Sequence, residues 1–518
     1  MQRSPNRDLF KDNTGAVAAT YAMSLTALMV IAGVGFDYGR LAAMDSELQN
    51  GADQAALAGA TQLDGATGAC SRAAARAVDL VTNTTVVATS ANTITVSAEA
   101  ACDAAGNVRF WQTKDHTSAA TSDANARFIE VIVASRSADY AFTPIAGVMR
   151  GTVQAAAMAG LGSSVCKVPP VFMCNPNQGG DPDFTIANYI GKGIRLIENT
   201  GGSTYGSGNF GYLANGTGGG TEDLREVLGR TAIPGDCVNA DSVTTQTGLR
   251  LSALDALNVR MDIYTGNVTQ ACDNDGSLCP PSANTRKDVM HKGGTNSCAF
   301  TNGNGAGWQF PSNAYYPTNS TSVLTGTQIT NTAPMGYPRD ICHTANQAGT
   351  FICDKVGDAN WDRNAYFKTN ANGSNPNYPS SFDISGALGT STPTRYQVYK
   401  YEAANAATRL KTNTSGGLDS IPQPYCRSPG VAVGGATADR RVLSVAVVNC
   451  TGANLSGQVT PVKWIDIFLV EPAVLRKVGS TQYTAASEVY VEVIGTTTLG
   501  GGSTAAQLIR RDVPYLVN

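Results

Sequence analysis

Residues 28–42 are LMVIAGVGFDYGRLA, an apolar run that ends at Phe36 and is followed at once by Asp37. From Gly15 to Phe36 there are 22 residues without a charge. As a helix this stretch rises about 33 Å, which is enough to cross a hydrocarbon core of about 30 Å. Its length alone fits either a secretion signal that is removed or a membrane anchor that is kept.

The residues around the end of the run favour the anchor. A cleavable signal has an apolar core of about 7–15 residues and ends at a small-x-small site. This run is longer, and it leads into Phe36-Asp37-Tyr38, a poor cleavage context. Apolar residues then recur at helical spacing beyond it, at Leu41, Met44, Leu48, Ala52 and Ala55. We therefore predict an uncleaved transmembrane helix over residues 15–36 that continues as an amphipathic extension.

Basic residues on the two sides of this helix predict its orientation. Arg3, Arg7 and Lys11 precede it, whereas Arg40 is the first basic residue after it. Because basic residues are enriched on the cytoplasmic side of membrane proteins, we expect residues 1–14 in the cytoplasm. The rest of the chain then lies outside the cytoplasm.

Twelve cysteines support an oxidising compartment independently. They are dispersed, and no CxxC pair of the kind used by zinc ribbons occurs. Disulfides are therefore expected. The candidates are Cys70, Cys102, Cys166, Cys174, Cys237, Cys272, Cys279, Cys298, Cys342, Cys353, Cys426 and Cys450. Many pairings are possible; short loops and neighbourhood favour Cys166–Cys174, Cys272–Cys279, Cys342–Cys353, Cys70–Cys102, Cys426–Cys450 and Cys237–Cys298.

Composition sets further bounds on fold and partners. Only 15 % of residues are charged, the net charge is −3, and no long basic run occurs, so nucleic-acid binding is not expected. With 42 % apolar residues the chain can build packed cores. Its abundance of Gly, Ser, Thr and Asn suits a strand-rich and loop-rich protein outside the cytoplasm.

Strand signals lie in two parts of the chain after the helix. The stretches 92–97 and 127–134 predict strands of a small first domain, and the proline pair at Pro169-Pro170 marks a break after it. A short helix is expected from Thr221 to Gly229, with these two residues as N-cap and C′. Near the C-terminus three β-rich runs predict strands: 442–448, 462–470 and 488–494.

These signals predict an α+β fold class with four segments. The fold is an N-terminal transmembrane helix with an amphipathic extension, a small α+β region, and a large β-rich, loop-rich ectodomain with disulfides. The segments are a cytoplasmic N-terminus at 1–14, the transmembrane helix at 15–36, a stalk helix with a small sheet at 37–162, and a cysteine-containing region at 163–518.

The N-terminal segment resembles a known family. Gly15-Ala16-Val17-Ala18, then Asp37 to Arg40, then the alanine-rich stretch from Ala52 to Ala58 are similar to the start of TadG-like proteins, which act in assembly of Tad (tight adherence, or Flp) pili. The pilin-like outline of the first domain is in part an implication of this resemblance. Pilins of these systems usually carry Glu five residues after the prepilin cleavage point, but Thr20 stands there, which argues against prepilin processing and polymerisation as a major subunit.

The resemblance implies a non-enzymatic, single-pass inner-membrane protein that assembles or anchors Tad pili. Its expected partners are the membrane, through residues 15–36, and pilus-assembly components or pilin-like subunits. The alternative is a surface adhesin or carbohydrate-binding module, in which exposed aromatic residues at Tyr315-Tyr316 and Trp361 stack on sugars.

Enzymatic signals are weak. The three histidines, His116, His291 and His343, lie in unrelated contexts, and no GxSxG, HExxH or P-loop motif occurs. We expect no catalytic residue and no cofactor. One weak calcium-loop candidate is Asp358, Asn360 and Asp362, whose alternate spacing could bring oxygens together; an Asx turn that bonds its own backbone explains the same residues.

Overall fold

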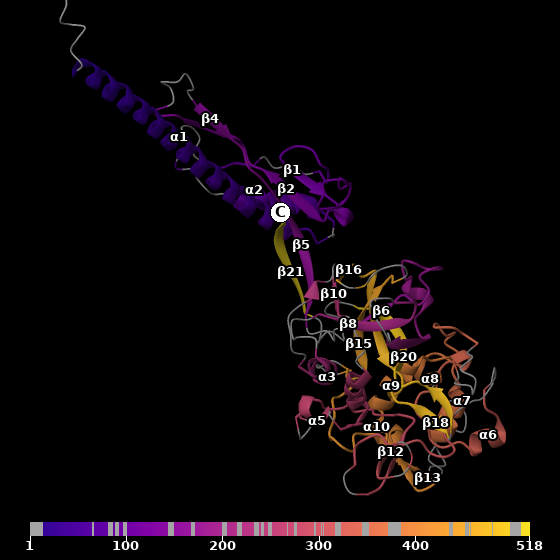
Figure 1. The fold of residues 1–518 in the computed structure, drawn as a ribbon. Coiled ribbons are helices and arrows are strands. Elements are labelled where there is room, and N and C mark those ends of the chain that lie inside the picture. Colours follow the sequence, from indigo (N-terminus) through magenta and orange to yellow (C-terminus); the bar gives the residue numbers. More distant parts are fainter. Residues whose placement is uncertain are drawn as a thin grey trace, which may run out of the picture. The chain divides into compact units, whose positions relative to one another are not determined.

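A computed structural model describes residues 14–517 apart from short stretches, which are 65–66, 81–85, 87, 89–92, 97–100, 143–149, 167–170, 199–204, 215–219, 233–237, 240–242, 247–250, 267, 274–276, 295–296, 302, 304, 316–322, 344–351, 371–384, 435–438, 451–454, 456, 479 and 498–508. The chain forms two compact units (Figure 1). Unit 1 is Met1–Ser163 with Asp512–Asn518, and unit 2 is Ser164–Arg511.

Unit 1 is built on one long helix, α1 (Thr14–Ala60). The second half of α1 packs on a small sheet, and helix α2 (Ala69–Leu80) packs against α1, through alanine-rich faces. The sheet order is β1-β2-β5-β21, with β3 and β4 as a separate pair. The strands are β1 (Val108–Trp111), β2 (Phe128–Ile132), β3 (Arg136–Asp139), β4 (Arg150–Val153), β5 (Ala156–Cys166) and β21 (Ile509–Val517). The long helix on a small antiparallel sheet confirms the expected outline.

A buried stripe on α1 explains how it holds this sheet. Along the helix Met44, Leu48, Ala52 and Ala55 are fully buried, and their spacing of three or four residues places them on one face. Gly59 belongs to the same contact, because a Cβ there would lie 2.5 Å from the Ile129 side chain. The amphipathic extension predicted from this spacing is thus the core-forming part of unit 1.

Unit 2 is centred on a β-barrel. The order β8-β6-β15-β17-β20-β7 closes on itself because β7 also pairs with β8. The six barrel strands are β6 (Val171–Cys174), β7 (Gly193–Glu198), β8 (Asn209–Leu213), β15 (Val442–Val448), β17 (Lys463–Leu469) and β20 (Glu488–Thr496). β10 (Val243–Gln246) and β16 (Gln458–Val459) extend the sheet beside β8.

Alternate residues of each barrel strand fill its interior. Leu443, Val445 and Val447 of β15 share one buried cluster with residues two apart on the other five strands. Helices α3 (Thr221–Gly229) and α4 (Asp255–Asn258) add leucines to the same cluster. Only a cavity of about 20 Å³ remains, too small for a ligand. The barrel is therefore a packed core rather than a binding pocket.

The remaining elements of unit 2 lie outside the barrel sheet, among them β9 (Val238–Asn239), which pairs with β5. The helices are α5 (Val268–Ala271), α6 (Gly326–Thr330), α7 (Arg363–Asn370), α8 (Ser385–Leu388), α9 (Arg395–Ala404) and α10 (Ala406–Arg409). The other strands are β11 (Met290–Lys292), β12 (Gly307–Gln309), β13 (Asn413–Ser415), β14 (Leu418–Ser420), β18 (Arg476–Val478) and β19 (Thr481–Thr484). Aromatic residues of α7 and α9 pack on Phe468 and Tyr490 of the barrel.

The predicted elements are largely confirmed. The fold mixes helices and strands as expected, and the three C-terminal strand runs appear as β15, β17 and β20. The helix expected from Thr221 to Gly229 is α3, but both expected caps are wrong. Gly220 is its N-cap, Gly229 is its last helical residue, and Arg230 is its C-cap. The strand expected at 92–97 is wrong for its described part, 93–96, where only Thr93 forms an isolated bridge. Residues 95 and 134 are nevertheless joined, since Ala134 N–H donates to the Thr95 carbonyl.

Five disulfides join described cysteines. Cys70–Cys102, Cys272–Cys279 and Cys342–Cys353 confirm three expected pairs. Cys174 instead pairs with Cys450, and Cys298 with Cys426, so the three other expected pairs are wrong. The reason is strand pairing: β6 and β15 are parallel neighbours with Cys174 beside Val448, which brings Cys450 to Cys174 across 276 residues. The Cys237 position and the Cys166 side chain lie outside the described residues.

Candidate functional site

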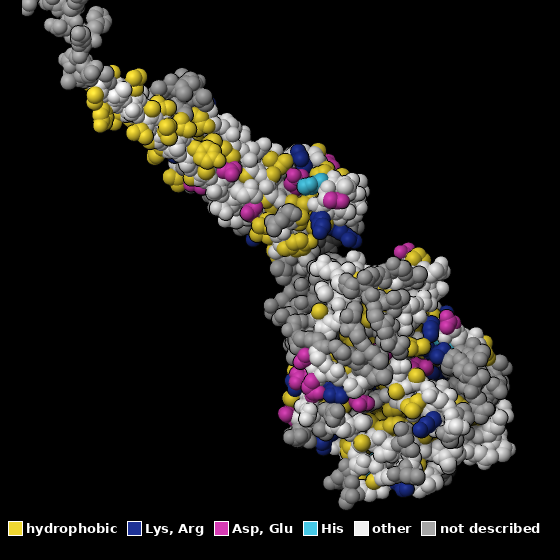
Figure 2. All heavy atoms as spheres, in the orientation of Figure 1, with side chains coloured by type: hydrophobic (Ala, Val, Ile, Leu, Met, Phe, Trp, Pro, Cys, Tyr) yellow, Lys and Arg dark blue, Asp and Glu magenta, His cyan; other side chains and the backbone are white. Residues whose placement is uncertain are grey.

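The first candidate site is the apolar surface of α1 before its buried stripe begins. From Val17 to Phe36 every described side chain is exposed except at Gly33. Large members are Tyr21, Met23, Leu25, Leu28 and Ile31, which are 57–74 % exposed. Figure 2 shows hydrophobic side chains gathered along this part of the helix. Within the described chain α1 alone is long and apolar enough to cross a membrane.

The second candidate is a network of buried ion pairs on the outside of the barrel. Arg395, at the start of α9, donates to Glu492 at 2.9 Å and also pairs with Asp340. All three side chains are at most 1 % exposed. The carboxylate of Glu492 also accepts the backbone N–H groups of Arg395 and Tyr396, both at 2.9 Å. The start of α9 is thereby fixed to barrel strand β20.

Asp340 shows why this network requires small neighbours. Its Oδ2 accepts the backbone N–H groups of Gly193 at 3.0 Å and Ala359 at 2.9 Å. A Cβ at Gly357 would lie 1.9 Å from the same oxygen, so only glycine fits there. Burial alone would raise the pKa of Asp340, but Arg395 and these donors hold it below its ordinary value.

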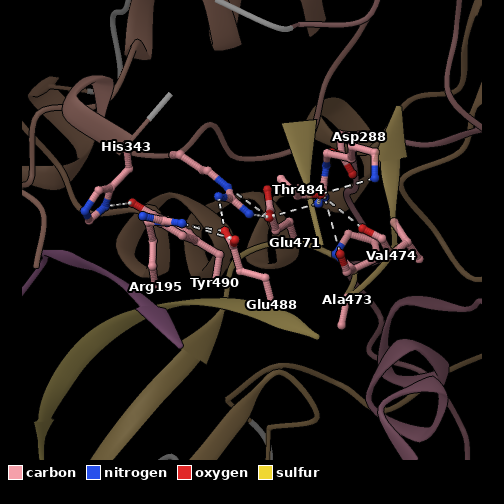
Figure 3. Close-up of polar contacts among 12 residues, drawn as sticks. Arg195, Asp288, His343, Glu471, Ala473, Val474, Thr484, Glu488 and Tyr490 are labelled. Atoms are coloured by element: carbon pink, nitrogen blue, oxygen red, sulfur yellow. Dashed lines mark hydrogen bonds and ion pairs between the residues drawn. The ribbon is translucent and has the colours of Figure 1, made fainter. Parts of the chain in front are cut away.

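A second series of ion pairs connects β20 with the segment after β17 (Figure 3). Glu488 pairs with Arg195 of β7 at 3.3 Å and with Arg339. Arg339 also pairs with Glu471, which accepts from Arg476 at 3.1 Å. Arg476 also pairs with Asp288 at 2.9 Å, and this is the last ion pair of the series. Apart from Asp288, which is 24 % exposed, these side chains are at most 9 % exposed.

His343 is the one histidine that touches this network. Its Nδ1 lies 3.1 Å from the Tyr490 hydroxyl, which accepts the N–H of Asp340. The pKa of His343 is lowered to about 3, chiefly because the ring is buried and in part because arginines surround it, so it is neutral. The adjacent Cys342 is bonded to Cys353 and offers no thiolate. Burial raises the pKa of the neighbouring Tyr490 hydroxyl well above its ordinary value, so its contact with His343 does not activate a nucleophile.

The network is thus suited to fixing segments in place. Its ion pairs connect β20 to β7, to residues 338–343, to the start of α9 and to the segment at 471–476. The charged side chains are paired and almost fully buried. Buried pairs contribute little net stability, but removal of one partner is strongly destabilising. We interpret the network as a clamp that gives the loop-rich part of unit 2 one defined position on the barrel.

The pKa of Glu488 predicts that acid loosens this clamp. Burial would raise that pKa, but Arg339 and Arg195 outweigh it and hold it at about 2, below the ordinary 4.5. Because the folded-state pKa is depressed, the stabilisation is complete above pH 4.5 and is lost as the pH falls toward 2; it amounts to about 3 kcal/mol. Urea unfolding at pH 7 and pH 3 should show that Glu488→Gln has a shallower loss in acid than the wild type. Equal losses would contradict this account.

The residues of the calcium-loop candidate are engaged with the backbone. Asp358 Oδ1 accepts the N–H of Asn360 at 3.0 Å, which is the Asx turn offered as the alternative. Asp362 precedes α7, and its two oxygens accept the N–H groups of Leu324 at 2.7 Å and Ala365 at 2.9 Å. The three residues therefore have local structural roles, and a calcium site remains a prediction of the sequence alone.

Two further groups of described residues place three potential metal ligands together. They are Cys342, His343 and Cys353, and Cys70, Cys102 and Asp123. Each group contains a disulfide, whose sulfurs are not thiolates and do not serve as ordinary zinc ligands. Asp123 instead accepts the N–H groups of Gly68 and Cys70 at the start of α2.

Of the aromatic residues singled out for sugar stacking, Trp361 is buried in unit 2. Trp361 is 1 % exposed and packs against Tyr366 and Phe367 of α7. Tyr315 is partly buried against the same cluster, and Tyr316 lies outside the described residues. The expectation of an exposed Trp361 is wrong because its indole N–H donates to the Pro393 carbonyl within the core.

One pattern in the sequence could have indicated part of the ion-pair network. In β20, Glu488 and Glu492 alternate with valines that face the barrel interior. Alternation of this kind usually indicates a solvent-exposed outer face. Here α7 and α9 pack against that face. Arg395 of α9 pairs with Glu492, whereas Arg195 of β7 and Arg339 pair with Glu488.

Comparisons with known proteins give one match. Residues 15–62 match the family model described as putative Flp pilus-assembly TadE/G-like. No curated protein and no solved structure matches the chain.

Proposed function

From the premise that residues 15–62 carry a TadE/G-like pilus-assembly domain, we propose that this chain is a non-enzymatic, single-pass inner-membrane protein that assembles or anchors Tad/Flp pili. Residues 15–36 cross the membrane, residues 1–14 are cytoplasmic, and the remainder forms a periplasmic ectodomain. The match to the family model is the observation that carries the proposal.

Three observations support the proposed topology. The apolar side chains of α1 from Val17 to Phe36 lie exposed, as expected for residues that face lipid. Five disulfides among described cysteines fit an oxidising compartment. Arg3, Arg7 and Lys11 precede the helix, which favours a cytoplasmic N-terminus.

The mechanism is one of anchoring and contact. The helix holds the protein in the membrane, and the ectodomain contacts pilus or secretion components. The packed barrel and the paired charges of unit 2 supply rigidity, which fits a structural role. Calcium is not required by this proposal.

Placing arginines in the span is expected to release the protein from the membrane. Leu25 and Leu28 lie near the middle of residues 15–36 and are 57 % and 64 % exposed. Each arginine at a helix centre costs about 3 kcal/mol in insertion. The variant Leu25→Arg/Leu28→Arg should be extracted from the membrane fraction by carbonate. The control Ser46→Arg, at an exposed position beyond the span, should remain in that fraction. Equal extraction of both variants would refute membrane anchoring.

The functional test is a count of surface pili after deletion of the gene. We expect loss of piliation and adherence, restored by the wild-type gene and by Ser46→Arg but not by the double-arginine variant. Piliation that is unchanged by the deletion would overturn the proposal.

A further inference from the structure

Asp37 occupies an unusual position on α1. Its neighbours Phe36 and Tyr38 are 55 % and 73 % exposed, whereas Asp37 is 2 % exposed. Its Oδ1 accepts the backbone N–H of Ala141 at 2.8 Å, and its Oδ2 accepts that of Phe142 at 2.9 Å. Hydrogen bonds of this kind to a carboxylate are among the stronger ones in proteins. The segment just after β3, at Ala141 and Phe142, is therefore bound directly to the helix at Asp37.

The same segment reaches one turn further toward the N-terminus of α1. Gly33 is buried, four residues before Asp37 and on the same face of the helix. A Cβ at Gly33 would lie 2.4 Å from the Cβ of Phe142, so the absence of a side chain permits this contact. Gly33 lies inside the apolar run, about 4.5 Å before its end at Phe36.

Phe142 is therefore held beside the apolar run while the residue stays exposed. Its side chain is 48 % exposed, and the ring packs edge-on against Phe36 with centroids 5.7 Å apart. The exposed surface of Phe142 continues the exposed apolar surface of α1. Aromatic side chains at such a position favour the interfacial layer of a bilayer.

We propose that Phe142 is a second membrane contact, which enters the outer interfacial layer of the lipid bilayer, and that Asp37 and Gly33 hold it there. The proposal rests on the proposed function, since it requires residues 15–36 to span a membrane. Asp37 satisfies two backbone N–H groups that would otherwise be costly to bring into this layer. Unit 1 is then fixed to the bilayer at two points rather than tethered by the helix alone.

Photo-crosslinking of the full-length chain in its native membranes tests this contact. Phe142 is replaced by p-benzoylphenylalanine, an aromatic residue that forms adducts with whatever touches it. The same residue is placed at Ile31, within the span, and at Val86, which is 86 % exposed in unit 1. The Val86 N–H donates to Glu47, about 21 Å along α1 from Gly33, so Val86 lies well outside the layer.

We expect lipid adducts from positions 142 and 31 and none from position 86. No lipid adduct at 142, with one at 31, overturns the membrane contact but leaves the anchor intact. Protein adducts at 142 in place of lipid adducts overturn it as well, because the occupant is then a polypeptide. No lipid adduct at 31 refutes the anchor itself.

A pair of glycine variants tests the role of α1 in holding Phe142. Gly33→Leu removes the space that Phe142 uses, whereas a Cβ at Gly35 would meet nothing within 4 Å. Both variants add the same apolar side chain to the helix, so insertion should be unaffected. Loss of the lipid adduct at 142 is expected in Gly33→Leu and in Asp37→Ala, with retention in Gly35→Leu. Equal yields in all three variants would exclude the proposed positioning.

Discussion

Replacement of Arg395 by methionine is expected to lower the free energy of unfolding of unit 2 by about 3–5 kcal/mol. Arg395 is fully buried between Asp340 and Glu492, which are also buried. Methionine fills a similar volume but leaves both carboxylates without their cation. The loss should appear as a lower urea midpoint of the full chain, measured by tryptophan fluorescence.

A matched control separates this effect from the loss of any arginine. Arg230 pairs with Glu226 at 2.9 Å, with side chains 23 % and 31 % exposed. Arg230→Met should therefore cost only about 1 kcal/mol. If Arg395→Met is no more destabilising than Arg230→Met, the buried pairs do not act as a clamp.

The second large effect is expected at the disulfide between the barrel strands. Cys174 and Cys450 are separated by 276 residues, whereas Cys272 and Cys279 are separated by seven. Because longer closed loops restrict the unfolded chain more, Cys174→Ala/Cys450→Ala should cost about 4–5 kcal/mol and Cys272→Ala/Cys279→Ala about 2 kcal/mol. Thermal and urea unfolding of both double variants, against the wild type, measure the two losses.

The test depends on which double variant loses more free energy of unfolding. Both double variants remove two buried sulfurs, so they differ mainly in the loop that the bond closes. A smaller loss for the Cys174–Cys450 variant would show that strand pairing alone holds β6 beside β15.

Elements with a regular pattern could be predicted from the sequence. The uncharged run and the spacing of Met44, Leu48 and Ala52 predicted α1, because a helix places such residues on one face. Dense β-branched runs likewise predicted β15, β17 and β20. These patterns are local, so the elements can be predicted without knowing which other elements they pack against.

Features that depend on distant partners could not be predicted. Barrel closure requires β7 beside β8, and the pairing of Cys174 with Cys450 follows from the parallel register of β6 and β15. Asp37 looked like the exit of the span into water, yet its amide partners lie 104 and 105 residues later in the chain. The burial of Trp361 could not be predicted for the same reason, because the sequence of α7 does not show that this helix packs on Trp361.

The proposed topology and the contact of Phe142 with the membrane both require that residues 15–36 remain in the mature protein as its anchor. N-terminal sequencing of the protein purified from the membrane fraction tests this directly. We predict a mature N-terminus upstream of the apolar run, so that the whole of residues 15–36 is retained. A mature N-terminus at or beyond Asp37 would show that the run is a removed signal and would contradict the account.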